Sequence, residues 1–194
     1  MTDQSFDNEK KVEASHFLQY ALKHLDVSKG SSVIDFGCGS LGYVGRLLLP
    51  DAKKVIFCDN SEKAISELKE NLKSVQLDNY EIWGNGINED EENIADVILS
   101  SMVMHHIEDI KKEVNKCFKL MKKGGKILFM DLKTEDGSFH GTMIVPHNGF
   151  NPTSVKEIFE EVGFVNVVFE DYEPFYMKSS EHSYERFAII ANKP

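Results

Sequence analysis

Short apolar runs alternate with helical stretches from residue 32 to residue 131, and this alternation restricts the fold more than any other feature of the chain. The runs are rich in β-branched residues and have the length of buried strands. Strands that alternate with helices are typical of βαβ units in a parallel sheet. The predicted strands are Ser32 to Phe36, Lys54 to Cys58, Tyr80 to Trp83, Ala95 to Ser100 and Lys126 to Asp131.

Capping residues mark the ends of the helices between these strands. Ser61 is of the type that caps the first turn of a helix. The cations and glycines of Lys122–Gly125 predict the end of a helix that begins near Asp109, because that end offers unpaired carbonyls and favours positive φ. Asn151-Pro152 predicts the start of a later helix, and Gly163 its end.

The last third of the chain contains two further predicted strands, Val165 to Glu170 and Arg186 to Asn192. No crossover helix joins them, so we expect an antiparallel pair connected through a segment that holds Tyr172, Phe175 and His182. The fold class is therefore α/β. We predict a single doubly wound, Rossmann-like domain with a mostly parallel seven-stranded sheet, helices on both faces and an antiparallel C-terminal strand pair. Residues 1–30 are predicted as an N-terminal helix or lid, and residues 31–194 as the ligand-binding domain.

The overall charge argues against nucleic acid as a partner. The 22 Lys and Arg residues face 32 Asp and Glu residues, which leaves a net charge of -10 that repels phosphate backbones. No apolar run approaches the ~20 residues of a membrane-spanning helix. The three cysteines lack metal-ligand spacing. We therefore expect a cytoplasmic protein without a membrane segment, a nucleic-acid partner or a metal site.

A glycine-rich turn follows the first predicted strand and opens a helix. Gly37, Gly39 and Gly42 spell the dinucleotide pattern GxGxxG, which is weak evidence on its own. Asp35 stands just before the turn, where its carboxylate repels a pyrophosphate and attracts a cation. The cationic sulfonium and ammonium of S-adenosylmethionine suit this position better than NAD does. Asp59, at the end of the next strand, has the position of a ribose-binding acid, which serves both cofactors alike.

Four segments in order resemble the motifs of the class I S-adenosylmethionine-dependent methyltransferases, and the small-molecule members of the type 11 and 12 groups in particular. They lie between residues 32 and 132. The segments are Val33 to Gly42, Val55 to Ser61, Ala95 to Ile107 and Leu120 to Leu128. One departure is Leu41, which stands where the family usually has glycine, with the third glycine displaced to Gly42.

The resemblance implies an S-adenosylmethionine site built from four loops. By position, the methionine part of the cofactor is surrounded by Asp35, Gly37, Cys38 and Gly39, and the ribose is held by Asp59. The adenine lies near Asn60, Asn85 and Gly86, and the reactive methyl group lies near Ser100.

Methyl transfer is an in-line displacement, and a base is needed only for an acceptor that is protonated at neutral pH. His105 and His106 are the predicted catalytic residues, because the resembled fold places this loop beside the methyl group and imidazole titrates near neutrality. They can equally pack against the next helix, and His140 and His147 can line the acceptor pocket or face solvent. A small-molecule acceptor is favoured, because the segment from Ser100 lacks the Asp/Asn-Pro-Pro-aromatic motif of base-methylating enzymes. A non-catalytic cofactor-binding module and an NAD(P)-dependent oxidoreductase are the alternatives.

Overall fold

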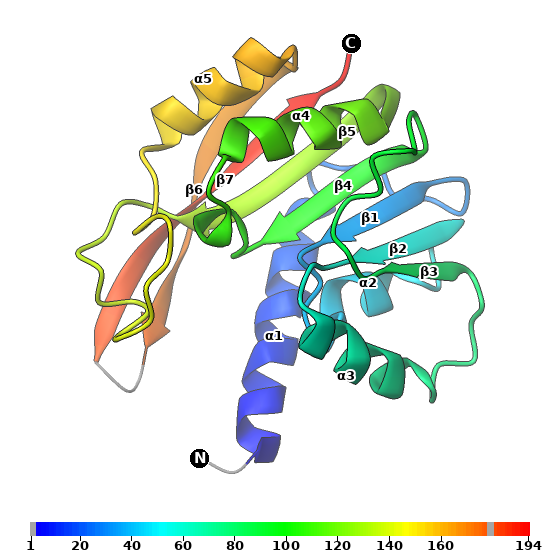
Figure 1. Ribbon diagram of the computed structural model, residues 1–194, viewed down its shortest axis with the longest axis horizontal. Helices are drawn as coiled ribbons and strands as arrows, with labels where there is room; N and C mark the ends of the chain where they lie inside the picture. Colours follow the sequence, from blue (N-terminus) through cyan, green and yellow to red (C-terminus); the bar gives the residue numbers. More distant parts are fainter. Residues whose placement is uncertain (1–2, 178–180) are drawn as a thin grey trace.

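The computed structural model describes residues 3–177 and 181–194, and in them seven strands form one sheet in the order β3-β2-β1-β4-β5-β7-β6 (Figure 1). Strands β1 to β5 are parallel, whereas β7 runs antiparallel to both β5 and β6. This arrangement confirms the predicted fold class. The strands are β1 (Ser32–Phe36), β2 (Lys54–Cys58), β3 (Tyr80–Trp83), β4 (Ala95–Ser101), β5 (Met121–Leu132), β6 (Val165–Met177) and β7 (His182–Asn192).

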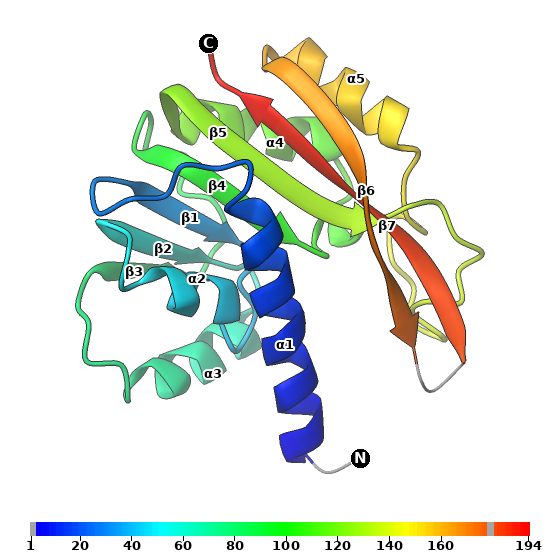
Figure 2. The same ribbon diagram turned by 180° about the vertical axis from the view of Figure 1, so that it is seen from behind.

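Helices cover both faces of the sheet, and side chains alternate along each strand between two cores. In β1, Ile34 and Phe36 join the core under α4 and α5, whereas Val33 joins the core under α1, α2 and α3 (Figures 1 and 2). The helical elements are α1 (Asp3–Ala21), α2 (Tyr43–Leu48), α3 (Glu62–Leu72), the 3-10 turn η1 (Met104–His106), α4 (Ile110–Leu120) and α5 (Pro152–Val162).

The predicted caps of two helices are confirmed. The Ser61 hydroxyl accepts a hydrogen bond from the Ala64 amide at 3.2 Å. The Asn151 carbonyl oxygen accepts one from the Thr153 amide at 2.9 Å, and α5 ends at Gly163, which has a φ of 114°. These local contacts fix where both helices lie relative to the strands that they connect.

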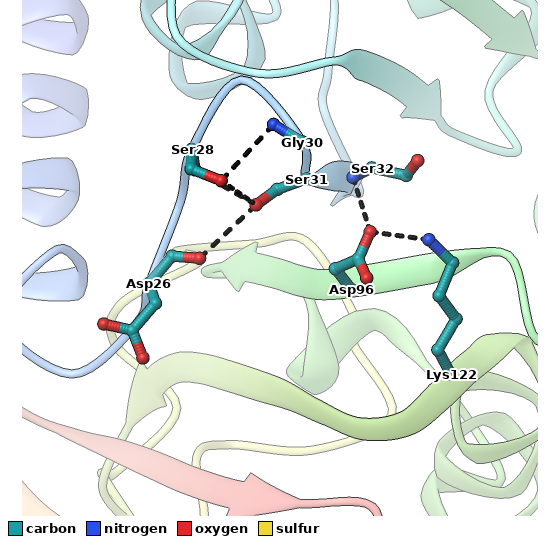
Figure 3. Close-up of polar contacts among 7 residues, drawn as sticks. All are labelled: Asp26, Ser28, Gly30, Ser31, Ser32, Asp96 and Lys122. Carbon is teal, nitrogen blue, oxygen red and sulfur yellow. Dashed lines mark hydrogen bonds and ion pairs between the residues drawn. The ribbon is translucent and has the colours of Figure 1, made fainter.

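The predicted end of α4 near Lys122–Gly125 is wrong, because the helix ends at Leu120 and β5 begins with the next residue. Met121 is fully buried and pairs with Ala95. Asp96 accepts 2.7 Å hydrogen bonds from the Ser32 amide and from the Lys122 ammonium group, which ties β1, β4 and β5 together at this end of the sheet (Figure 3). In the same figure, contacts among Asp26, Ser28 and Ser31 shape the turn that enters β1.

The C-terminal strands are longer than predicted, and Tyr172, Phe175 and His182 belong to them instead of to a connecting loop. The residues 178–180 lie outside the described part. The guanidinium group of Arg186, 2% exposed, lies 4.8 Å from the ring centroid of Tyr172 and 5.5 Å from that of Phe175. These cation–π contacts hold the extended hairpin together.

Helix α1 packs on the face of the sheet that is turned toward the viewer in Figure 2. Phe17 and Ala21 are buried in the core that α2 and α3 share, and the Arg186 guanidinium binds the Glu13 carboxylate at 3.0 Å. This ion pair fastens α1 to the β6–β7 hairpin. The function of residues 1–30 as a lid stays a prediction. None of the helices in the described residues has both the length and the apolar character needed to cross a bilayer.

Candidate functional site

The carboxyl ends of the central strands meet at one edge of the sheet. In the parallel register, Phe36 pairs with Cys58 and Ser100, and Ser100 pairs with Phe129. The loops that follow β1, β2, β4 and β5 therefore leave the sheet side by side. In open α/β sheets this edge is where ligands bind.

The glycine loop after β1 is held against β2 by its own backbone. The amides of Gly37 and Cys38 donate to the Cys58 carbonyl at 2.8 and 3.1 Å. A Cβ atom on Gly37 would lie 2.2 Å from a methyl carbon of Val103, so no side chain fits there. At Gly39, with φ of 63°, an added Cβ would meet no described atom within 4 Å. One side of the loop is closed by Val103, and the other is open.

Close packing explains why the third glycine of the loop lies at position 42. Gly42 adopts the left-handed conformation, with φ of 53° and ψ of 35°, at the start of α2. An added Cβ would lie 2.7 Å from Leu68 and 2.9 Å from Phe57. Glycine at 42 therefore lets α2 lie directly on β2 and α3, even though Leu41 stands at the family's usual glycine position.

Asp59 joins the first two loops. One carboxylate oxygen accepts from the Gly39 amide at 2.8 Å, and the other accepts from the Ser61 amide at 2.9 Å. A carboxylate has about four acceptor sites, so two bonds leave it able to accept more. The side chain is half-buried, beside the open side of the glycine loop.

Asp35 lies under the first turn of α2. It is 5% exposed, and its Oδ2 accepts from the Gly45 amide at 2.8 Å. Burial raises the pKa of Asp35 to about 7, the negative charge of Asp59 adds to the rise, and the Gly45 hydrogen bond opposes it. The carboxyl group thus supports the loop from beneath, close enough to Asp59 for the two charges to interact.

The loops after β2 and β3 lie next to one another. The Gly86 amide donates to the Asp59 carbonyl at 3.1 Å, and a Cβ on Gly86 would lie 3.8 Å from the Cβ of Asn60. Asn60 and Asn85 are both exposed. The three residues predicted to lie near the adenine are therefore brought to the same end of the sheet as Asp59.

Ser100 lies at the base of the site, 2% exposed, and its hydroxyl has no hydrogen-bond partner among the described residues. The chain then turns at Met102, a non-glycine residue with φ of 59°, whose amide donates to the Met130 carbonyl at 2.8 Å. This turn directs Val103 onto Gly37 and carries the chain into η1.

His105, in η1, is buried and paired with Asp131 at the end of β5. Its Nδ1 lies 2.5 Å from the Asp131 carboxylate, which also accepts from the amides of Leu132, at 2.7 Å, and His105, at 3.3 Å. Asp131 is fully buried. Because a carboxylate accepts, the Nδ1 of His105 is the donor in this contact, and Nε2 is the ring nitrogen that Asp131 leaves unbound. Sequence reasoning missed Asp131, although an acid that interrupts an apolar strand is the signal that identified Asp35.

His106 and His140 complete a histidine cluster, in which the ring centroid of His105 lies 4.2 Å from that of His106 and 4.7 Å from that of His140. Burial and the neighbouring imidazoles lower the pKa of both His106 and His140. The loop after β5 carries His140 to this place. His147 fastens that loop to η1, since its amide and its Nε2 donate to the carbonyls of His105, at 3.3 Å, and Ile107, at 2.9 Å.

A doubly wound sheet with a glycine loop after β1 and an acid after β2 defines the class of Rossmann-like proteins that bind nucleotide cofactors. Within that class, residues 6–168 match the family model described as a methyltransferase domain. The chain therefore belongs to the class I S-adenosylmethionine-dependent methyltransferase family, as its motifs predicted.

One similar protein is an uncharacterized methyltransferase of Schizosaccharomyces pombe, which is 27% identical over 71% of this chain and 54% of the relative. A ubiquinone biosynthesis O-methyltransferase of Coxiella burnetii is 27% identical over 63% of this chain and 53% of the relative. The chain thus spans about half the length of these curated relatives.

Among solved structures, the chain is similar to phosphoethanolamine N-methyltransferase 2 of Haemonchus contortus in complex with phosphomonomethylethanolamine and S-adenosylhomocysteine. The TM-score is 0.78 at 16% identity, over 93% of this chain and 52% of that one. It is also similar to the Haloferax volcanii complex of the Trm112 methyltransferase activator and a putative methyltransferase, with a TM-score of 0.79 at 15% identity, over 98% and 94% of the two chains. At these identities, the likeness shows the fold.

Proposed function

We propose that this protein transfers the methyl group of S-adenosylmethionine to a small-molecule acceptor by in-line displacement. The observation that carries the proposal is the meeting of two sets of residues at one edge of the sheet. One set is the open glycine loop with Asp59, and the other is the Asp131–His105 pair. Val103, two residues before His105, packs on Gly37.

The residues at the edge suit the cofactor. The open side of Gly39 lets a ligand approach the backbone, and Asp59 has unused acceptor sites for two ribose hydroxyls. The Ser100 hydroxyl offers an unpaired donor at the base of the site. We assign Asp35, Gly37, Cys38 and Gly39 to the methionine part, with Asp35 acting from beneath the loop as a negative charge, and Asn60, Asn85 and Gly86 to the adenine.

A small molecule is the favoured acceptor. The net charge of -10 opposes nucleic acid, and relatives named for O- and N-methylation include the ubiquinone biosynthesis enzyme and phosphoethanolamine N-methyltransferase 1 of Triticum aestivum. The wheat relative is 30% identical over 76% of this chain, which spans 31% of that relative. We place the reaction in the cytoplasm.

The histidine cluster is where an acceptor hydroxyl would lose its proton. His105 is held in one orientation by Asp131, and His106 is exposed, so each predicted catalytic residue offers a nitrogen near the site. Orientation of the acceptor opposite the sulfonium supplies most of the acceleration, which reaches about 7–11 kcal/mol in favourable systems. A matched base contributes a further factor of about 10²–10⁴.

Two measurements test the proposal. Calorimetry should show binding of S-adenosylhomocysteine and none of NADH, and Asp59→Ala should weaken that binding while the exposed control Asp78→Ala leaves it unchanged. Incubation with methyl-labelled S-adenosylmethionine and a metabolite extract should then label a small molecule. Binding of NADH alone would refute the cofactor. Tight binding of S-adenosylhomocysteine without transfer to any extract would identify a non-catalytic module instead.

A further inference from the structure

The geometry points to a divalent transition-metal site formed by His105, His106 and His140, with zinc as the best-suited ion. One ligand atom from each of these residues lies within 4.8 Å of the other two. The binding of the ion is inferred independently of the proposed function, whereas its action on the acceptor rests on that function.

Small side-chain movements would bring the three nitrogens to coordination distance. Zinc binds imidazole at about 2.0–2.1 Å in a tetrahedral arrangement, which separates the nitrogens by roughly 3.4 Å. The longest separation therefore needs to shorten by roughly 1.4 Å. His106 is exposed and His140 is in a loop, so both can rotate toward the fixed ring of His105. Three protein ligands leave a fourth position open, as in catalytic zinc sites.

Asp131 prepares His105 to act as a ligand. The carboxylate is fixed by backbone amides and accepts a hydrogen bond from Nδ1, so Nε2 is the ring nitrogen left to bind an ion. Metal-binding histidines in proteins usually donate their other N–H to a carboxylate, a backbone carbonyl or water, and such a partner fixes the ring and raises its basicity as a ligand. A buried acid whose one side-chain partner among the described residues is His105 is therefore a second observation that fits a metal ligand.

His140 supplies an independent observation. Its Nε2 is buried and has no hydrogen-bond partner in the described part of the chain. An unpaired buried polar atom destabilises the fold, and coordination would remove that cost. Glu135 accepts from the amides of Gly137, at 2.9 Å, and Phe139, at 3.1 Å, and so shapes the turn that presents His140. Glu135 and Asp131 also bring negative charge to the cluster.

The position of the cluster suggests what the ion would do. Val103, one residue before η1, packs on Gly37, so the segment that carries His105 and His106 lies against the loop that we assign to the cofactor. A bound divalent ion lowers the pKa of a coordinated hydroxyl group. The acceptor O–H bond would then break with its proton passing to water, the oxygen would take the methyl group, and the S–CH₃ electron pair would stay on sulfur. We therefore infer an acceptor that carries a hydroxyl group.

Metal titration of the purified chain, stripped with a chelator and free of any histidine tag, tests the site. We expect one Zn²⁺ or Co²⁺ per chain by calorimetry, and visible Co²⁺ bands of the tetrahedral type. His106→Ala and His140→Ala should each weaken binding at least about 10-fold. The control His16→Ala, a half-exposed residue of α1, should bind like the wild type. Substoichiometric binding, or two cluster variants that bind the ion as tightly as the wild type does, would overturn the proposal.

Asp131→Asn tests the supporting carboxylate, with an expected loss of about 10–100-fold in metal affinity. Circular dichroism must show that this buried variant folds, and the two cluster variants decide the question if it does not. Metal-free protein separates this inference from the proposed function. Unchanged affinity for S-adenosylhomocysteine, with methyl transfer that returns on adding Zn²⁺, supports the inferred role. Full transfer by protein that binds no metal refutes the metal site and leaves the methyltransferase assignment intact.

Discussion

The buried carboxyl group of Asp35 should make the stability of the fold depend on pH. Its pKa is raised from 3.8 to about 7, chiefly because burial disfavours the charged form. Asp35→Asn removes the titration but keeps an oxygen that can accept from the Gly45 amide. The difference in unfolding free energy between wild type and variant therefore isolates this one group.

The sign follows from the protons bound in each state. Between its two pKa values the folded protein keeps Asp35 protonated while the unfolded chain has lost the proton, so stability falls as pH rises. The contribution is complete below the unfolded value of 3.8, is lost as pH rises through about 7, and is constant above that. Each pKa unit corresponds to about 1.36 kcal/mol. From about pH 5 to about pH 7, the wild type should therefore lose roughly 2–3 kcal/mol relative to the variant.

Urea unfolding followed by circular dichroism at several pH values measures this difference. The exposed acid Asp78, changed to Asn, controls for the loss of one negative charge and should give a nearly constant difference. A constant difference between wild type and Asp35→Asn from about pH 5 to about pH 7 would refute the reasoning. S-adenosylmethionine, a cation, should favour the charged carboxylate, so its affinity should rise with pH through about 7 in the wild type only.

Three further changes have expected effects. Asp59→Ala should weaken S-adenosylhomocysteine binding by about 1.5–3 kcal/mol, the range for hydrogen bonds to a charged group, measured by calorimetry. Gly45→Ala should destabilise the fold by about 1–3 kcal/mol in urea unfolding, because the new Cβ would lie 2.4 Å from the Phe57 ring. Glu13→Gln should cost about 1–3 kcal/mol in thermal unfolding, because the buried Arg186 guanidinium loses its ion pair.

Matched controls exist for two of these changes. Gly30→Ala introduces a Cβ whose nearest neighbour is 3.7 Å away, so it should leave stability almost unchanged. Equal stability of the alanine variants at positions 30 and 45 would contradict the close packing of α2 on β2. For Asp59, the exposed acid Asp78 provides the comparison, and equal losses at both positions would point to a general charge effect. An unchanged melting temperature in Glu13→Gln would show that the ion pair between Glu13 and Arg186 does not stabilise the fold.

The parts of the fold that were predicted correctly depend on contacts within a few residues. Ser61 and Asn151 cap their helices through amides two or three positions away, so the sequence around them was sufficient. Lys122 was misplaced because the pairing of Met121 with Ala95 overrides a local helix-ending pattern. The long C-terminal hairpin escaped notice for the same reason, because Arg186 stabilises it through rings on the other strand.

The candidate site likewise contains residues that the sequence could locate and features that it could not. A parallel sheet brings its strand ends together, so an acid that closes an apolar strand can be assigned to that edge, and this reasoning located Asp35 and Asp59. It does not determine which way the side chain turns. Asp35 turns under α2 because Gly45 leaves room for it, whereas Asp131 turns to His105, which joins it only through the bend at Met102. The resemblance therefore named members of the histidine cluster, but spacing along the chain could not show that His140 meets His105 and His106, because loop geometry brings them together.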